Sequence, residues 1–250
     1  MMNWIKKKYY QAISAEEGNL YSNSDGCTLI LSSFKRPKNV KKILAAYMDY
    51  ALLDEIIIWH NGPEKLDIGA FDEDVKIIES NDLGLASRYA AGLLASNDIV
   101  LLQDDDIFFE EESLRIIVNE SIKNPERTIT SEGKIPHKDN TYGKGIKPGI
   151  GEKIECEIHL NRLVCTKREF IPHFFSTLYK TGLSLNPRTG GGEDIVYSYA
   201  ITNFTGKKPL AVGVSYKNLS SKEAISDRYG NQHANRTDIM KICKQLFEES

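Results

Sequence analysis

The sequence predicts an α/β protein with a mostly parallel central sheet flanked by helices and a smaller mixed portion in its second half. Short runs of Val, Ile and Leu alternate with segments of helical periodicity between residues 27 and 123. These runs are apolar almost throughout, which is typical of parallel strands covered on both faces. Polar residues follow several runs directly, at the sheet edge where such folds bind ligands.

Four strands and three helices are expected in the first half. Short apolar runs bounded by polar or turn-forming residues predict strands CTLILSS (27–33), EIIIWHN (55–61), VKIIES (75–80) and DIVLLQ (98–103). Helical spacing, an alanine-rich face or an acidic first turn predicts helices at 40–51, 85–96 and 110–123.

The second half is less regular. Residues 132–155 are rich in Gly and Lys, which predicts a long loop or a hairpin, and alternation predicts a strand at 155–165. We expect a helix at 168–179, a second helix that starts at the acidic pair after three glycines, and a strand at 209–214.

Composition narrows the class of protein. The formal net charge of −3 argues against a protein that mainly grips nucleic acid. Four widely spaced cysteines without a CxxC pair argue against a zinc site and favour reduced, buried thiols. The sequence lacks an apolar run of the roughly 20 residues that a membrane span needs, so we expect a cytoplasmic protein. The basic and aromatic start, MMNWIKKKYYQAI, allows a peripheral contact with a membrane surface.

Three consecutive aspartates, Asp104, Asp105 and Asp106, end the strand at 98–103. Adjacent carboxylates repel one another and are costly to bury, and a hard cation such as Mn²⁺ or Mg²⁺ offers compensation. Side-chain alternation would place Asp104 and Asp106 on one side and Asp105 on the other. The simpler interpretation is an acidic turn that caps the following helix.

Five stretches together resemble the C-terminal transferase domain of exostosins and exostosin-like proteins, glycosyltransferase family 64. They are LILSSFKRP, EIIIWHNG, NDLGLASR, DIVLLQDDDIFF and GGEDIVYSYAI. The resemblance runs from about residue 27 to residue 215 and implies the GT-A fold, a Rossmann-like sheet that binds a nucleotide sugar. It also implies a catalytic domain at 27–215, with a nucleotide-binding half (27–131) and an acceptor half (132–215). A flanking segment (1–26) and a C-terminal lid and helix (216–250) complete the expected organisation.

The resemblance also implies roles for individual residues. Asp106 corresponds to the metal ligand, and Asp194, beside Glu193, corresponds to the acidic residue near the transferred sugar. Arg228, in the C-terminal segment, is the nearest match to an arginine that faces the diphosphate, and Lys222, His233 and Arg236 are other candidates there. The donor nucleotide and sugar would be held by Ser33, Phe34, Arg36, Asn61, Asn81, Arg88, Asp104 and Asp105.

Two of these assignments have simpler alternatives. Arg88 could be an exposed helix residue in a surface ion pair. Glu193 and Asp194 could form the acidic first turn of a helix, and both interpretations can hold together.

The expected function is metal-dependent transfer of a hexosyl or N-acetylhexosaminyl group from a nucleotide diphosphate sugar, with UDP as the expected nucleotide. The resemblance implies retention of anomeric configuration. Family members from secretory compartments have disulfides and a membrane anchor, and this sequence departs from them because it shows no signal, anchor or evident cysteine pairing. We therefore expect a glycan or lipid-linked acceptor at the inner membrane face, as in polysaccharide biosynthesis. The alternatives are a nucleotidyltransferase and a binding module with a degenerate site. SSFKRP has no glycine, which counts against the glycine-rich basic loop usual in the first of these.

Overall fold

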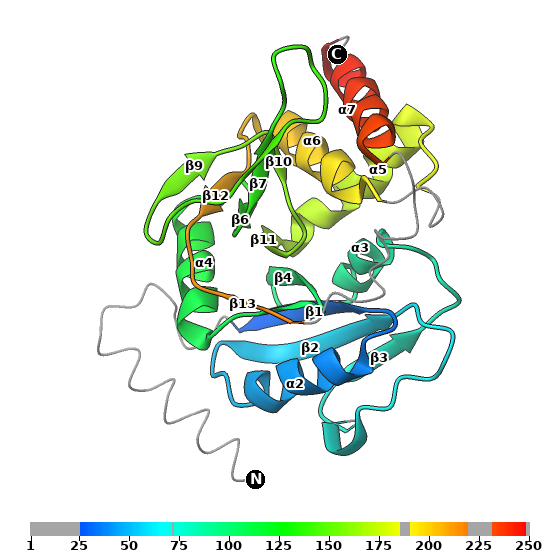
Figure 1. Ribbon diagram of the computed structural model, residues 1–250, viewed down its shortest axis with the longest axis vertical. Helices are drawn as coiled ribbons and strands as arrows, with labels where there is room; N and C mark the ends of the chain where they lie inside the picture. The colour runs from blue at the N-terminus through cyan, green and yellow to red at the C-terminus, as the bar shows by residue number, and fades with distance from the viewer. Residues whose placement is uncertain (1–25, 72, 186–190, 220–231, 249–250) are drawn as a thin grey trace.

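The structure is a computed structural model that describes residues 26–71, 73–185, 191–219 and 232–248. Within these residues, an eight-stranded sheet has the order β3-β2-β1-β4-β11-β6-β12-β9 (Figure 1). Its strands are β1 (Cys27–Ser33), β2 (Leu53–His60), β3 (Lys76–Glu79), β4 (Ile99–Asp104), β6 (Ile129–Thr130), β9 (Lys153–Glu155), β11 (Leu163–Lys167) and β12 (Leu210–Val212).

Strand direction divides the sheet into two parts. Strands β3, β2, β1 and β4 run parallel, so their carboxyl ends meet at one edge. Antiparallel pairing begins at β11, which lies between β4 and β6. This mixed, mostly parallel sheet flanked by helices confirms the predicted fold class.

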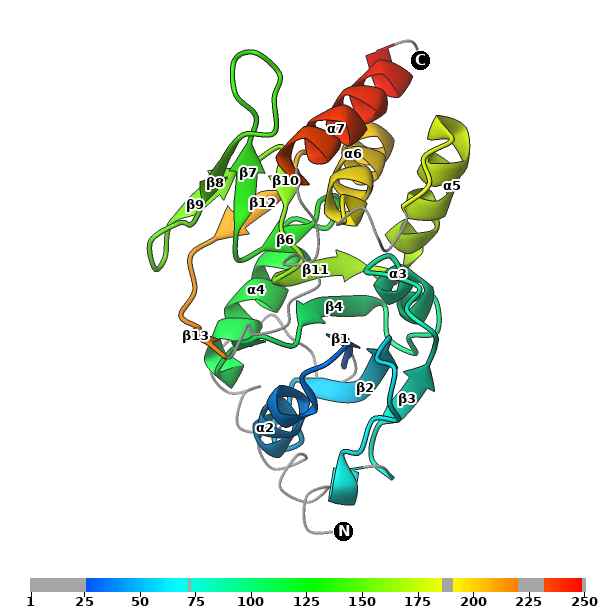
Figure 2. The ribbon, with the colours of Figure 1, turned by 45° about the vertical axis from the view of Figure 1, so that its right-hand side comes forward.

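Helices cover both faces of the sheet (Figure 2). One buried cluster packs residues of α2 (Pro37–Tyr47) and α4 (Glu111–Lys123) against alternate residues of β1, such as Leu29 and Leu31. On the other face, Ile30 packs in a second cluster. That cluster includes side chains of α3 (Ser87–Gly92), α5 (Ile171–Thr181), α6 (Glu193–Thr205) and α7 (Gln232–Glu248). The two-sided burial explains why the strands are apolar almost throughout.

The prediction of one strand at 155–165 is wrong. The chain forms β10 (Ile158–His159), turns at residues 160–162, and continues as β11. The two strands have different partners, because β10 pairs with β7 (Gly133–Ile135) whereas β11 pairs with β4 and β6. The turn thereby lies beside the end of β4.

The glycine- and lysine-rich segment contains a hairpin, as predicted. Strand β7 pairs antiparallel with β8 (Lys144–Ile146), and β9 follows. A further small ladder joins β5 (Ile107–Phe108) to β13 (Lys217–Asn218). This ladder holds the chain immediately after the three aspartates.

Two helices are shorter than their patterns suggested. Helix α2 begins at Pro37 and ends at Tyr47, and α3 spans only Ser87–Gly92. None of the helices in the described ranges has the length and apolar character needed to cross a bilayer.

Candidate active site

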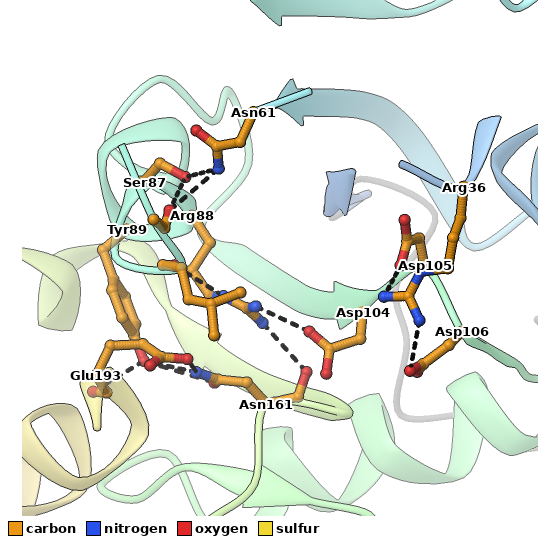
Figure 3. A network of polar contacts seen from close by, with 12 residues as sticks. Arg36, Asn61, Ser87, Arg88, Tyr89, Asp104, Asp105, Asp106, Asn161 and Glu193 are labelled. Carbon is orange, nitrogen blue, oxygen red and sulfur yellow. Dashed lines mark hydrogen bonds and ion pairs between the residues drawn. The ribbon is translucent and has the colours of Figure 1, made fainter. Parts of the chain in front are cut away.

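Polar side chains gather at the edge where the parallel strands end (Figure 3). Strand β4 ends at Asp104, and Asp105 and Asp106 form the turn before β5. The backbone carbonyl of Asp106 accepts a 2.7 Å hydrogen bond from the N–H of Leu219, next to the β5–β13 ladder. This hydrogen bond and the adjacent β5–β13 ladder therefore hold the turn in place.

The three aspartates face two directions. Asp104 and Asp106 line a pocket of about 310 Å³, whereas Asp105 does not line it and is only 2 % exposed. Although β4 ends at Asp104, the side chains of the three aspartates still alternate in direction, as they would in a strand. The two carboxylates on the pocket side are the ones available to a ligand.

Arg36 binds two of the aspartates. It lies just before α2, and its guanidinium contacts Asp105 at 2.5 Å and Asp106 at 2.9 Å. Burial alone would lower the pKa of Arg36, but the charges of Asp105 and Asp106 outweigh it and the pKa is raised. Burial raises the pKa of the Asp105 carboxyl to about 7, against the opposing effect of Arg36. Arg36 therefore offsets part of the cost of placing these carboxylates together.

Arg88 is buried rather than exposed, which excludes a surface ion pair. Its side chain is 1 % exposed, and it lies 2.8 Å from an oxygen of Asp104. A second N–H of its guanidinium donates to the backbone carbonyl of Asn161 at 3.2 Å. Removing either partner of such a pair would leave a buried charge without compensation. Arg88 therefore stabilises Asp104 in its observed position.

The acidic pair Glu193 and Asp194 opens α6 and also lines the pocket, so both interpretations of the pair hold. The Glu193 carboxylate accepts a 3.1 Å hydrogen bond from the side-chain amide of Asn161. Burial and the negative charge of Glu193 raise the pKa of Asp194 to about 7, while Arg236 opposes the shift. Asp194 is thus poised to change its charge near neutral pH.

Gly192 determines the backbone direction with which the chain enters α6. Its φ of 103° lies in a region that residues with a side chain rarely adopt, and a Cβ there would lie 2.5 Å from Ile239 Cδ1. We expect Gly192→Ala to reduce the free energy of unfolding by about 1–3 kcal/mol and to lower activity, because it tilts the acidic pair. Chemical denaturation and turnover measure the two effects.

Gly206→Ala is the matched control for this prediction. Gly206 ends the same helix with φ 75°, and a Cβ there would meet no atom within 4 Å. We expect this variant to lose stability while its activity per folded molecule is unchanged. A Gly192→Ala variant that keeps both stability and activity would contradict the role given to Gly192.

A second pocket, of about 380 Å³, lies beside the first. Its lining includes Phe34, Asn61 and Asn81, which the sequence assigned to the nucleotide. Phe34 and Lys35 face this pocket while the next residue, Arg36, faces the pocket of the aspartates. The short loop after β1 therefore contributes side chains to both of these pockets.

Asn61 and Ser33 also have structural partners. The Asn61 amide donates to the Gly84 carbonyl at 3.1 Å and to the Ser87 hydroxyl at 2.9 Å, so it fixes the loop before α3. Ser33 is buried against His60, with 2.9 Å between its hydroxyl and Nδ1, and it lines neither pocket.

Several pocket residues had no role assigned from the sequence. They come from the loop before α3, from the β7–β8 hairpin and from the turn before β11, and they are Leu85, Lys134, Tyr142, Leu160, Asn161 and Arg162. Arg236, named only as another candidate, reaches the pocket from α7. The rings of His233 and Tyr142 lie nearly perpendicular to each other, with 5.9 Å between their centroids. Arg228 and Lys222 lie outside the described residues.

The chemistry of the pocket suits a hard divalent cation. Asp104 and Asp106 offer two carboxylates on one wall, and Mn²⁺ or Mg²⁺ is commonly bound through one or two carboxylates together with water and phosphate oxygens. In the part of the chain that the structure describes, no group of three or more His, Cys, Asp or Glu could hold an ion alone. Water and substrate oxygens would complete the coordination shell of an ion held by these two carboxylates.

The parallel sheet with acidic side chains at its carboxyl edge defines a GT-A-like protein. One solved structure with this fold is "GalNAc-T7 with UDP, GalNAc and Mn2+", with a TM-score of 0.56 and 13 % sequence identity. The match covers 80 % of this chain and 44 % of that one, so the chain spans less than half the length of that protein. No curated protein sequence gives a significant match.

The particular family follows from the sequence match. The glycosyl transferase family 64 domain matches residues 27–249, and the chain therefore belongs to this family. The resemblance to exostosin-like transferases is thereby confirmed.

Proposed function

We propose that the protein transfers a hexosyl or N-acetylhexosaminyl group from a nucleotide diphosphate sugar, with UDP as the nucleotide, and requires Mn²⁺ or Mg²⁺. The observation that carries the proposal is the meeting of Asp104, Asp106 and Asp194 in one pocket beside a second pocket lined by Asn61 and Asn81. The first suits a metal, a diphosphate and a sugar, and the second suits a nucleoside.

The pocket residues would have different roles in the transfer. Asp106 and Asp104 would hold the cation, which neutralises charge on the departing diphosphate when bound. Arg36 and Arg236 present guanidinium groups in the same pocket, where they can bind phosphate oxygens. Asp194 lines the same pocket, where an ionised carboxylate can stabilise positive charge on the sugar ring or orient the acceptor.

Arg236 replaces Arg228 as the first candidate for the diphosphate. Its side chain lines the pocket, and its charge acts on both Asp194 and Lys134. Lys134 and Arg162, also in the pocket wall, add positive charge toward the acceptor half. A glycan or lipid-linked acceptor, retention of configuration and an optional contact at the inner membrane face belong to the proposal and are supported by the exostosin-like resemblance and the basic N-terminal sequence.

The proposal predicts that activity depends on an added divalent cation. With a panel of UDP-sugars and Mn²⁺, we expect transfer or slow donor hydrolysis that EDTA reduces at least about 100-fold, since a metal contributes several kcal/mol to transition-state stabilisation. Excess Mn²⁺ should restore the rate. NMR of the anomeric proton in the product reports retention or inversion.

Two outcomes would contradict this proposal. Turnover that EDTA does not change would remove the metal from the mechanism. Thermal stabilisation by UDP and Mn²⁺ without turnover on any donor would favour a binding module over an enzyme.

A further inference from the structure

A buried polar network connects the two acidic parts of the pocket, which are Asp104 with Asp106 and Glu193 with Asp194. It consists of Asp104 on β4, Arg88 on α3, Asn161 in the turn between β10 and β11, and Glu193 at the start of α6. Figure 3 shows these side chains in sequence from the aspartate edge to α6. Asn161 is the member that joins Arg88, which binds Asp104, to Glu193.

Asn161 makes its two connections with different groups. Its backbone carbonyl accepts from Arg88 Nη1 at 3.2 Å, and its side-chain amide donates to Glu193 Oε1 at 3.1 Å. The same amide nitrogen lies 3.1 Å from the hydroxyl of Tyr89, which also donates to the backbone carbonyl of Glu193 at 3.4 Å. Asn161 and Glu193 are 6 % and 4 % exposed. Hydrogen bonds of this kind are strong because little water competes for the donor and the acceptor.

The turn that carries Asn161 is itself fixed. The N–H of Leu160 donates to the carbonyl of Glu132 at 2.9 Å, and the carbonyl of Arg162 accepts from the N–H of Asp104 at 3.4 Å. The Thr130 hydroxyl donates to the carbonyl of Leu160 at 3.2 Å. Asn161 therefore presents its amide from a rigid support next to the end of β4.

We propose that Asn161 is a positioning residue for sugar transfer, which holds the Glu193 carboxylate, and with it Asp194, at a fixed place relative to Asp104 and Asp106. This inference rests on the proposed function. Four carboxylates line one pocket and repel one another, so the distance between the two acidic parts depends on the groups that bind them. Misplacement of reacting groups by about 1 Å can lower a rate about 100-fold.

Replacement by aspartate tests the amide selectively. Asn161→Asp keeps the size and shape of the side chain but places a second carboxylate beside Glu193. When ionised, the new carboxyl repels Glu193 and cannot donate. When protonated, it can donate the hydrogen bond that the amide donated. Like-charge coupling and burial raise the pKa of such a group, so the change between these forms is expected near neutral pH.

The charged and titratable groups around Asn161 and Glu193 come from several elements. They are Arg88 and Tyr89 from α3, Asp104 from β4, His159 from β10, Tyr142 before β8, Asp194 from α6 and Arg236 from α7. All of them are present in both the wild type and the variants. Asn161→Leu has no titratable group at this position, so the difference in pH dependence between Asn161→Asp and Asn161→Leu reports the new carboxyl together with its effect on these neighbours.

The experiment compares Asn161→Asp and Asn161→Leu with the wild type between pH 6 and pH 8. At pH 8, we expect both variants to lower kcat about 10- to 100-fold, with the KM for the donor changed less than about threefold. As the pH falls to 6, the ratio for Asn161→Asp should recover several-fold, whereas the ratio for Asn161→Leu should stay constant. A merely structural role would give no such difference between the two variants.

Asn97 supplies the matched control. It lies just before β4, at the opposite end of the strand, and its amide donates to Thr28 at 3.1 Å next to the Glu55 carboxylate. Asn97→Asp and Asn97→Leu should change the melting temperature but leave kcat within about twofold. If Asn161→Leu does not fold, Asn161→Ala takes its place.

The results separate two failures. An active wild type with Asn161 variants no slower than the Asn97 variants, or with an Asn161→Asp deficit that is constant across pH, would overturn the inference and leave the proposed function intact. A wild type that transfers no sugar from any donor would overturn the proposed function, and the inference with it.

Discussion

Asp106→Asn is expected to lower kcat/KM about 100-fold or more and to remove the stabilisation that UDP and Mn²⁺ together give the wild type. Asp106 lines the pocket with Asp104, and a neutral amide binds a hard cation much more weakly than a carboxylate. The variant also leaves Arg36 with Asp105 as its remaining acidic partner at this turn. Turnover and thermal denaturation, each with and without Mn²⁺, measure the two effects.

Asp98→Asn is the control for this substitution. Asp98 lies just before β4 at the opposite end of the strand, is 89 % exposed, and pairs with Arg168. We expect normal turnover and a normal response to Mn²⁺ from this variant. An Asp106→Asn variant that behaves in the same way would show that the cation, if one is used, binds elsewhere.

Asp194→Asn is expected to lower kcat about 100- to 10,000-fold, which is the range found for groups that act on charge or protons at the reacting centre. In the wild type, burial and Glu193 raise the pKa of Asp194 to about 7, so its carboxylate is ionised only above that pH. Activity that needs the ionised form should therefore rise with pH through about 7. Rates measured from pH 5.5 to pH 8.5 should lose this rise in the variant.

The melting temperature of Asp194→Asn tests whether the pKa of Asp194 is raised on folding. A carboxyl whose pKa is raised on folding binds more protons in the folded state, so its ionisation destabilises the fold as pH rises. At pH 8, Asp194→Asn should consequently melt at or above the wild-type temperature although it is nearly inactive. Glu193→Gln removes the charge beside Asp194 and should move the rise in activity to lower pH. A wild-type profile that is flat from pH 5.5 to pH 8.5 would contradict this account of Asp194.

The first half of the fold was predictable because its signals are local. Strand β1 has the predicted bounds, and apolar runs also marked β2 and β4. Because parallel strands end at one edge, the aspartates, the loop with Arg36, and Asn61 could be placed together from the sequence. The acidic pair was assigned through the exostosin-like resemblance, and the glycines before it allow the backbone entry that Gly192 adopts.

Contacts that join distant parts of the chain were not predictable in the same way. Asn161 lies in a segment that alternates like one strand, and its position in a turn depends on the exchange of partners between β10 and β11. Arg236 reaches the pocket only because α7 packs against α6. The buried pairing of Arg88 with Asp104 needs α3 to lie beside β4, which helical periodicity alone does not specify.

The most direct test of the central claim is a crystal structure of the protein with UDP and Mn²⁺, in which anomalous scattering locates the metal. We predict Mn²⁺ within coordination distance of the Asp106 carboxylate, the UDP diphosphate in the same pocket, and the uridine in the pocket lined by Asn61 and Asn81. A metal bound away from Asp104 and Asp106, or a nucleotide bound at another face of the sheet, would contradict it.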